Sequence, residues 1–219
     1  MKVILFGASG MVGQGVLREC LLDPGIESIL SIGRTKTGKK DPKLREIITQ
    51  NAGNLDPISD DLRGFDACFF SLGVSSLGMT EADYRRITYD LTLDAAQTLA
   101  RINPSMTFIY VSGQGTDSTE RGRSMWARVK GETENALLRL PFKAAYMFRP
   151  GFIQPLHGIQ SKTALYRIPY AILGPFSGLI RRAFPKYATT TEILGRAMIK
   201  AARDGAPKKV LETEDINAL

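Results

Sequence analysis

The stretch that decides the fold is Val3-Ile4-Leu5-Phe6-Gly7-Ala8-Ser9-Gly10-Met11-Val12-Gly13. It begins with a continuous apolar run, which is typical of a strand buried on both faces. Three glycines follow at intervals of three, and beyond them Leu17, Leu21 and Leu22 recur at helical spacing. The stretch therefore predicts a strand, a glycine-rich turn and a helix. Such a turn brings unpaired backbone N–H groups and the positive end of the helix dipole close to a phosphate.

The same alternation of strands and helices continues along the chain. Further strands are predicted at Ser28–Ile32, Glu46–Thr49, Asp66–Phe70, Met106–Val111 and Ala144–Phe148, and helices at Glu81–Arg101, Arg123–Arg139 and Thr190–Ala202. Strands that alternate with helices form crossover units, which require a parallel sheet covered on both faces. We therefore expect the α/β class and a doubly wound Rossmann fold, with six or seven mostly parallel strands.

The length of 219 residues and the apolar content of 43% predict one domain with a core of its own. We expect residues 1–150 to form a cofactor-binding core, and residues 151–219 to form a substrate cap and the last helix. Gly151 to Pro185 is rich in Gly, Pro and aromatic residues and is expected to form a small C-terminal cap over the carboxyl edge of the sheet. Its aromatic residues predict a partly apolar pocket or a small core of their own: Phe152, Tyr166, Tyr170, Phe176 and Phe184.

Composition excludes several kinds of site. The chain has one His and two Cys, so a multi-histidine metal centre and a disulfide framework are excluded and no metal site is predicted. No segment has the apolar length of a membrane span, and a cytoplasmic protein without membrane attachment is expected. The formal charge of +7 comes without a recognition-helix or zinc-finger pattern, so nucleic acid is not an expected partner. A homodimer is possible.

The glycine turn and the following strand ends predict a dinucleotide site. The phosphate-holding residues are expected to be Gly7, Ser9, Gly10, Met11, Val12 and Gly13. The next strand ends at Arg34, where NAD-binding chains carry a carboxylate and NADP-binding chains often carry Arg. A guanidinium can fork onto a 2′-phosphate, so NADP is favoured, with NAD possible. The alternative is a solvated basic loop formed by Arg34, Lys36, Lys39 and Lys40.

Two later strand ends can complete the cofactor groove. Asn54 and Leu55 are expected near the adenine, and Ser71, Leu72 and Gly73 follow the fourth strand at the switch point of the sheet. Small residues there let the backbone lie against a ligand. Either segment can also be an ordinary turn.

Taken together, these motifs resemble the extended and atypical branch of the short-chain dehydrogenase/reductase superfamily, and within it the proteins similar to human Tat-interacting protein and their bacterial relatives. Besides the glycine turn, the residues that carry the resemblance are Cys68-Phe69-Phe70-Ser71-Leu72-Gly73, Ser112, Trp126-Ala127-Arg128-Val129-Lys130-Gly131-Glu132 and Phe148-Arg149-Pro150-Gly151. The resemblance implies that Ser112 polarises a substrate carbonyl. It also implies that Lys130 binds the cofactor ribose and that Pro150, Gly151 and Phe152 contact the cofactor.

One residue departs from the pattern of this superfamily. The resemblance implies a Tyr four residues before Lys130, which exchanges the proton and whose pKa the Lys lowers, but Trp126 stands there. An indole N–H donates hydrogen bonds and does not ionise usefully near neutral pH. None of the seven tyrosines has a Lys four residues later. The catalytic Tyr is therefore replaced and has not moved elsewhere.

Three interpretations follow for a chain whose small-molecule substrate is unknown. It can bind and sense NAD(P)(H) as a regulator with impaired oxidoreductase chemistry, which is the interpretation we favour. It can be an active NADPH-dependent reductase or a nucleotide-sugar-epimerase-like enzyme that takes its proton from Ser112, a nearby Tyr, His157 or water. Or the pocket can be vestigial and filled by Trp126.

The sequence leaves the roles of two further side chains open. His157 lies just beyond Pro150 and Gly151, where a structural or exposed role is more common for a lone His than proton transfer. Arg149 can contact substrate, but its place before Pro-Gly favours ordering of the turn through backbone carbonyls.

Overall fold

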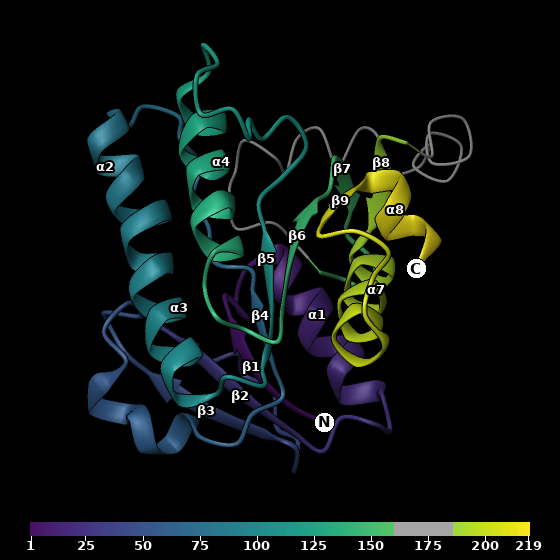
Figure 1. The fold of residues 1–219 in the computed structure, drawn as a ribbon. Coiled ribbons are helices and arrows are strands. Elements are labelled where there is room, and N and C mark those ends of the chain that lie inside the picture. Colours follow the sequence, from purple (N-terminus) through teal and green to yellow (C-terminus); the bar gives the residue numbers. More distant parts are fainter. Residues whose placement is uncertain (160–185) are drawn as a thin grey trace.

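A seven-stranded parallel sheet forms the centre of the molecule (Figure 1), in a computed structural model that describes residues 1–159 and 186–219. The strand order is β3-β2-β1-β4-β5-β6-β9. The strands are β1 (Lys2–Phe6), β2 (Ser28–Gly33), β3 (Leu44–Ile48), β4 (Ala67–Phe70), β5 (Thr107–Val111), β6 (Ala144–Arg149) and β9 (Val210–Glu212). Every pairing in this sheet is parallel. The expected α/β class and doubly wound Rossmann fold are therefore confirmed.

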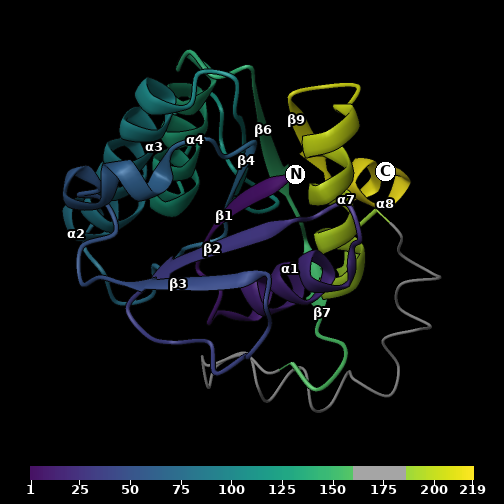
Figure 2. The same cartoon turned by 90° about the horizontal axis from the view of Figure 1, so that it is seen from below.

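Helices cover both faces of the sheet, as Figures 1 and 2 show. One face carries α1 (Met11–Leu22), α7 (Thr191–Asp204) and α8 (Thr213–Ala218). The other carries α2 (Glu81–Arg85), the π-helical turn η2 (Arg86–Asp90), α3 (Leu91–Ile102) and α4 (Met125–Leu138). A 3-10 helix, η1 (Asp56–Leu62), precedes β4, and a separate parallel pair joins β7 (Phe152–Gln154) to β8 (Ala188–Thr190).

The central strands are apolar on both sides because both faces are covered. In β1, Val3 and Leu5 pack in the core under α1 and α7, and Ile4 and Phe6 pack in the core under α3 and α4. All four are fully buried. This explains why β1 is a continuous apolar run and not an alternating one.

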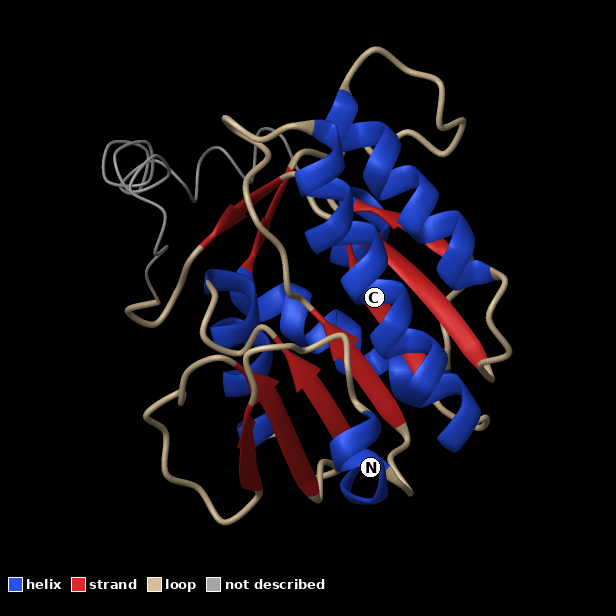
Figure 3. Cartoon of the chain, turned by 90° about the vertical axis from the view of Figure 1, so that its left-hand side faces the viewer, coloured by secondary structure: helices blue, strands red, loops and turns tan. Residues whose placement is uncertain are grey.

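The Rossmann layers continue past residue 150, where the sequence predicts only a cap and a last helix. β9 pairs with β6 and becomes the edge of the sheet. α7 lies directly on α1 (Figures 1 and 2), and a Cβ on Gly15 would come within 2.6 Å of Thr191. Figure 3 shows the molecule from the side of α2 and α3, with helices in front of the strands. Of the predicted cap, the residues from 160 to 185 lie outside the described residues, and Tyr166, Tyr170, Phe176 and Phe184 lie among them.

The predicted helix over Glu81–Arg101 is continuous in space but not in its hydrogen bonding. The π-helical turn η2 separates α2 from α3, and such turns occur mostly as single insertions within α-helices. Over the parts of the chain that the structure describes, every helix is too short or too polar to cross a bilayer.

Candidate active site

The glycine turn after β1 has the backbone conformation that its sequence predicts. Gly7 has a φ of +80°, and a Cβ there would lie 2.7 Å from the carbonyl oxygen of Ser71. A Cβ on Gly13 would collide even more closely with the Gly7 carbonyl oxygen. The N–H of Gly10 donates to that same oxygen at 2.9 Å. Glycine is therefore required at Gly7 for both conformation and space, and at Gly13 for space.

The turn leaves the N-terminus of α1 open toward the carboxyl edge of the sheet. Gly10 is the N-cap and forms no side-chain cap, and the first turn contains no acidic residue. Ser9, Met11 and Val12 are partly exposed beside it. A pyrophosphate fits this arrangement, because the glycines leave space that a Cβ would fill and the N–H groups that follow are uncapped.

Arg34 follows β2 directly and is exposed. Its side chain makes no hydrogen bond or ion pair within the described part of the chain, and Lys36, Lys39 and Lys40 are also exposed. The guanidinium is therefore free to meet a ligand, and its contact with a 2′-phosphate stays a prediction.

The residues at the other two strand ends differ in how far they are exposed to a ligand. Asn54 is exposed beside η1, whereas Leu55 is fully buried in the core, so the Leu55 side chain lies away from any groove. Ser71 donates its hydroxyl to the Phe6 carbonyl at 2.7 Å, which ties β4 to β1 beside Gly7. Leu72 is partly exposed and Gly73 is exposed.

Lys130 and Trp126 lie one turn apart on α4. The Lys130 ammonium donates to the carbonyl oxygen of Ser112 at the end of β5 and lies 5.7 Å from the centre of the Tyr110 ring. Burial lowers the pKa of Lys130 to about 8, although the Glu134 carboxylate acts in the opposite direction. Trp126 is half-buried and its ring edge faces Gly115 in the loop after β5. Lys130 thus lies beside the end of β5, one helical turn after Trp126, and its contact with a cofactor ribose stays a prediction.

Ser112 is oriented differently from what its implied role requires. Its hydroxyl is buried and donates to Glu134 at 2.5 Å, with the Phe148 carbonyl as a second acceptor at 3.2 Å. Glu134 is 1% exposed and also accepts from Arg149, at 3.0 Å from Nε and 2.5 Å from Nη2. In this arrangement the Ser112 hydroxyl lies in the core and does not present itself to a substrate carbonyl.

Arg149 also departs from its expected role. Its guanidinium binds Glu134, Glu212 at 3.2 Å and Ser118 at 2.5 Å, and it does not order the turn through backbone carbonyls. The physical reason is burial: Arg149 is only 9% exposed, and a buried guanidinium requires carboxylate partners. The side-chain network therefore joins α4, β6 and the start of α8.

The turn at Pro150 and Gly151 is held by one backbone–backbone hydrogen bond and one hydrogen bond to a side-chain hydroxyl. The Gln114 N–H donates to the Pro150 carbonyl at 2.9 Å, and the Gly151 N–H donates to Thr213 Oγ1 at 2.8 Å. A Cβ on Gly151 would lie 2.5 Å from the Tyr187 carbonyl oxygen. Phe152 follows, half-exposed at the start of β7. These residues lie next to the loop that follows β5, and their contact with a cofactor stays a prediction.

His157 is exposed and bound to the opposite layer of the fold. Its Nε2 lies 2.6 Å from Glu192 at the start of α7, and Glu192 also pairs with Arg196 at 2.9 Å. The hydrogen bond from His157 lowers the pKa of Glu192. The structural role that the sequence favours for His157 agrees with this geometry.

Sequence reasoning missed Glu134, whose carboxylate determines the orientation of Ser112. A signal was present, because Glu134 lies four residues after Lys130 and therefore on the same side of α4. The apolar spacing of the helix would bury that side, and a carboxylate at a buried helical position requires a cationic partner. The sequence does not indicate that this partner is Arg149.

The sheet order and the glycine turn define a Rossmann fold. The chain resembles the atypical members of the short-chain dehydrogenase/reductase superfamily, and the comparisons confirm that resemblance. No protein-family model matches the chain.

Several curated proteins are similar in sequence. Protein fmp52-2 of Aspergillus terreus is 26% identical over 224 residues, which covers 97% of this chain and 93% of the relative. Protein HTATIP2 of Rattus norvegicus is 27% identical over 154 residues, covering 69% of this chain and 62% of the relative. The leucinostatins biosynthesis cluster protein T of Purpureocillium lilacinum is 29% identical over 79% of this chain and 65% of its own.

Solved structures share the fold at lower identity. The Bordetella bronchiseptica enzyme WbmF in complex with NAD+ matches with a TM-score of 0.67 and 15% identity, over 99% of this chain and 76% of that chain. UDP-glucuronic acid 4-epimerase from Bacillus cereus in complex with NAD matches with a TM-score of 0.68 and 15% identity. The match covers 96% of this chain and 77% of that chain. The chain therefore has the fold of NAD-binding dehydrogenases and epimerases.

The expectation of a cytoplasmic protein is contradicted. The fmp52 relatives from Aspergillus terreus, Emericella nidulans, Meyerozyma guilliermondii and Chaetomium globosum are all named as mitochondrial proteins. The expectation rested on the lack of a recognisable leader in the sequence, and that lack does not determine the compartment.

Proposed function

We propose that this chain is a nicotinamide-dinucleotide-binding protein that prefers NADP(H) and has lost conventional short-chain-dehydrogenase proton transfer. The observation that carries the proposal is the glycine cradle at Gly7 and Gly13 below the uncapped start of α1. The same fold holds NAD in the solved structures of WbmF and of UDP-glucuronic acid 4-epimerase. The dinucleotide, when bound, would supply or accept hydride.

The residues of this chain support a defined set of contacts. The N–H groups at the start of α1 would bind the pyrophosphate, and Asn54 would lie toward the adenine side of the groove. The free guanidinium of Arg34 would bind a 2′-phosphate, and Lys130 would hold the ribose next to the nicotinamide. No carboxylate follows β2 at the place where an NAD-specific chain carries one.

Impaired chemistry is supported by two side chains together. Trp126 cannot release a proton near neutral pH. The Ser112 hydroxyl already donates to Glu134 within the core. The two groups that the superfamily uses for proton transfer and carbonyl polarisation are therefore replaced or engaged. Binding without turnover suits a cofactor-sensing role.

Titration of the purified protein with NADPH and NADH tests the cofactor preference. Trp126 is the only tryptophan, so its emission reports directly on occupancy of the site. We expect NADPH to bind roughly 10- to 100-fold more tightly than NADH, because a charge-assisted hydrogen bond contributes about 1.5–3 kcal/mol. Arg34→Ala should remove this preference. Arg139→Ala, at the far end of α4, is the matched control and should retain it.

Equal affinities of the wild-type chain and Arg34→Ala for NADPH would disprove the 2′-phosphate contact. Failure to bind either dinucleotide at micromolar concentration would disprove the proposed function as a whole. The loss of chemistry is tested separately by NADPH oxidation with a panel of aldehydes, ketones and quinones. Turnover by the wild-type chain would favour the active reductase or epimerase-like alternative.

A further inference from the structure

A buried ion pair lies next to the carboxyl ends of β5 and β6. Glu134 of α4 is 1% exposed, and its two carboxylate oxygens accept hydrogen bonds from Arg149, the last residue of β6, at 3.0 Å and 2.5 Å. The desolvation of two charges offsets much of their attraction, and apolar residues of similar volume are often at least as stabilising. A requirement for stability therefore does not by itself account for a charged pair here, and the hydrogen bonds that the pair makes to other segments indicate a further role.

The pair anchors the β5 loop (residues 112–118) at both of its ends. Glu134 accepts a hydrogen bond at 2.5 Å from the hydroxyl of Ser112, the first residue after β5. Arg149 donates a hydrogen bond at 2.5 Å to the hydroxyl of Ser118. One carboxylate and one guanidinium therefore hold this loop against α4 and β6.

The turn that follows Arg149 is joined to the β5 loop as well. The Gln114 N–H of this loop donates to the Pro150 carbonyl at 2.9 Å. A Cβ on Gly151 would lie 2.4 Å from Oε1 of Gln114, so the turn and the loop are in close contact. A change in the position of Arg149 would therefore displace the turn and the loop together.

The β5 loop and this turn belong to one half of the sheet. The strand order reverses between β1 and β4, and a dinucleotide on such a sheet extends across that point, with one nucleotide on each side. Arg34 after β2 and Asn54 after β3 belong to the half that is proposed to hold the adenine. Because β5 and β6 belong to the other half, the loop and the turn would border the nicotinamide.

We propose that the pair of Glu134 and Arg149 positions the nicotinamide half of the dinucleotide site, without contacting the cofactor and without affecting the adenine half. The pair acts through the β5 loop and the turn at Pro150. Ser112 has a part in this positioning, because its hydroxyl is one of the anchors of the loop. The inference rests on the proposed function, since it requires that the chain bind a dinucleotide.

Two ligands distinguish the two halves of the site. NADPH spans both halves, whereas adenosine 2′,5′-bisphosphate has the adenine and the 2′-phosphate but lacks the nicotinamide. Calorimetry below the unfolding transition should show that Arg149→Lys loses roughly tenfold in affinity for NADPH and less than about twofold for the bisphosphate. A lysine keeps the charge of the pair, but its compact ammonium cannot reproduce the fork that joins Glu134 to Ser118.

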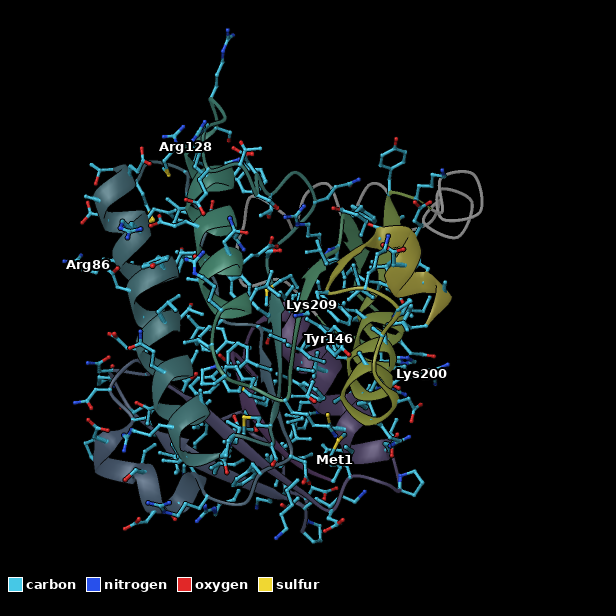
Figure 4. The ribbon with its side chains drawn as sticks, in the orientation of Figure 1. Met1, Arg86, Arg128, Tyr146, Lys200 and Lys209 are labelled. Atoms are coloured by element: carbon cyan, nitrogen blue, oxygen red, sulfur yellow. The ribbon has the colours of Figure 1, made fainter. Side chains whose placement is uncertain are left out.

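Arg86→Lys is the matched control for this substitution. Arg86 pairs with Asp83 at 3.3 Å, its side chain is 72% exposed, and Figure 4 shows it pointing away from the sheet. This variant should bind both ligands as the wild-type chain does.

The double variant Glu134→Leu with Arg149→Met tests whether the pair has only a structural role. It leaves no charge unpaired, so it should be more stable than either single variant, but it lacks the anchors of Ser112 and Ser118. Its affinity for NADPH should stay roughly tenfold below that of the wild-type chain. Recovery of the wild-type affinity would overturn the inference, as would equal losses of affinity for the two ligands in Arg149→Lys.

The two ligands also separate this inference from the proposed function. A wild-type chain that binds neither ligand would disprove the proposed function and the inference with it. If the wild-type chain binds both ligands and Arg149→Lys binds them equally well, the proposed function stands and the positioning role is disproved. If the double variant does not fold, the result for Arg149→Lys decides.

Discussion

Replacing Glu134 by Gln should strongly destabilise the fold, although the two side chains have the same shape. The change leaves the buried guanidinium of Arg149 with Glu212, which is 41% exposed, and with the neutral hydroxyl of Ser118. It also places an amide where two carboxylate oxygens accept from Ser112 and Arg149. Removing one partner of a buried pair costs about 3–5 kcal/mol. Glu134→Gln should therefore lower the free energy of unfolding by about 3 kcal/mol.

Urea denaturation followed by circular dichroism and by Trp126 fluorescence measures this loss. With a slope of about 2 kcal/mol per molar urea, the midpoint should fall by about 1.5 M. The matched control is Glu132→Gln on the same helix, where the pair with Arg85 is partly exposed and contributes at most about 1 kcal/mol. The double variant Glu134→Gln with Arg149→Met should lose less than the sum of its single variants, because no charge is left unpaired.

Equal stability of Glu134→Gln and Glu132→Gln, within about 0.5 kcal/mol, would refute the stabilising role of the buried pair between Glu134 and Arg149. Simple additivity of the losses in unfolding free energy from Glu134→Gln and Arg149→Met would also refute it. Either result would show that the Ser112, Glu134 and Arg149 network does not act as one unit.

Three other outcomes are expected. Gly13→Ala should abolish NADPH binding and lower the free energy of unfolding by about 1–3 kcal/mol, because its Cβ would overlap the Gly7 carbonyl. The control is Gly33→Ala, whose Cβ would have no atom within 4 Å. This variant should be nearly neutral when NADPH binding and thermal unfolding are measured in parallel. The affinity for NADPH should fall as the pH rises through about 8, where Lys130 loses its charge, and calorimetry on Lys130→Arg should show no such fall. Gly151→Ala should destabilise the turn against Tyr187 and lower the melting temperature; an unchanged value would contradict the backbone contact.

Local signals predicted the fold well because each of them acts within a few residues. The apolar run of Val3 to Phe6 and the glycines after it determine a strand, a turn and a helix without help from distant parts of the chain. The sequence did not predict β9, because Val210–Glu212 is only three residues long and becomes a strand through pairing with β6. Tertiary pairing, not local propensity, makes that segment extended.

For Ser112 and Lys130 the sequence predicts the place in the fold but not the direction of the side chain. The sequence places Ser112 and Lys130 at the end of β5 and on α4, where the structure has them. Which way the Ser112 hydroxyl points depends on Glu134 and Arg149, which come from different elements of the fold. A spacing rule for one motif contains no information about such a partner, so a matching Ser does not establish a usable hydroxyl.

The pairing of β9 with β6 has a consequence for biosynthesis. The Met147 N–H donates to the Lys209 carbonyl, so the backbone of β6 is satisfied on that side only after residues 209–212 have been made. Until the ribosome has added the whole segment from 150 to 209, β6 is an open strand edge that can pair with another chain. During this interval most of the parallel sheet is already present while one of its edges stays unpaired, which is the condition that exposes a nascent chain to aggregation.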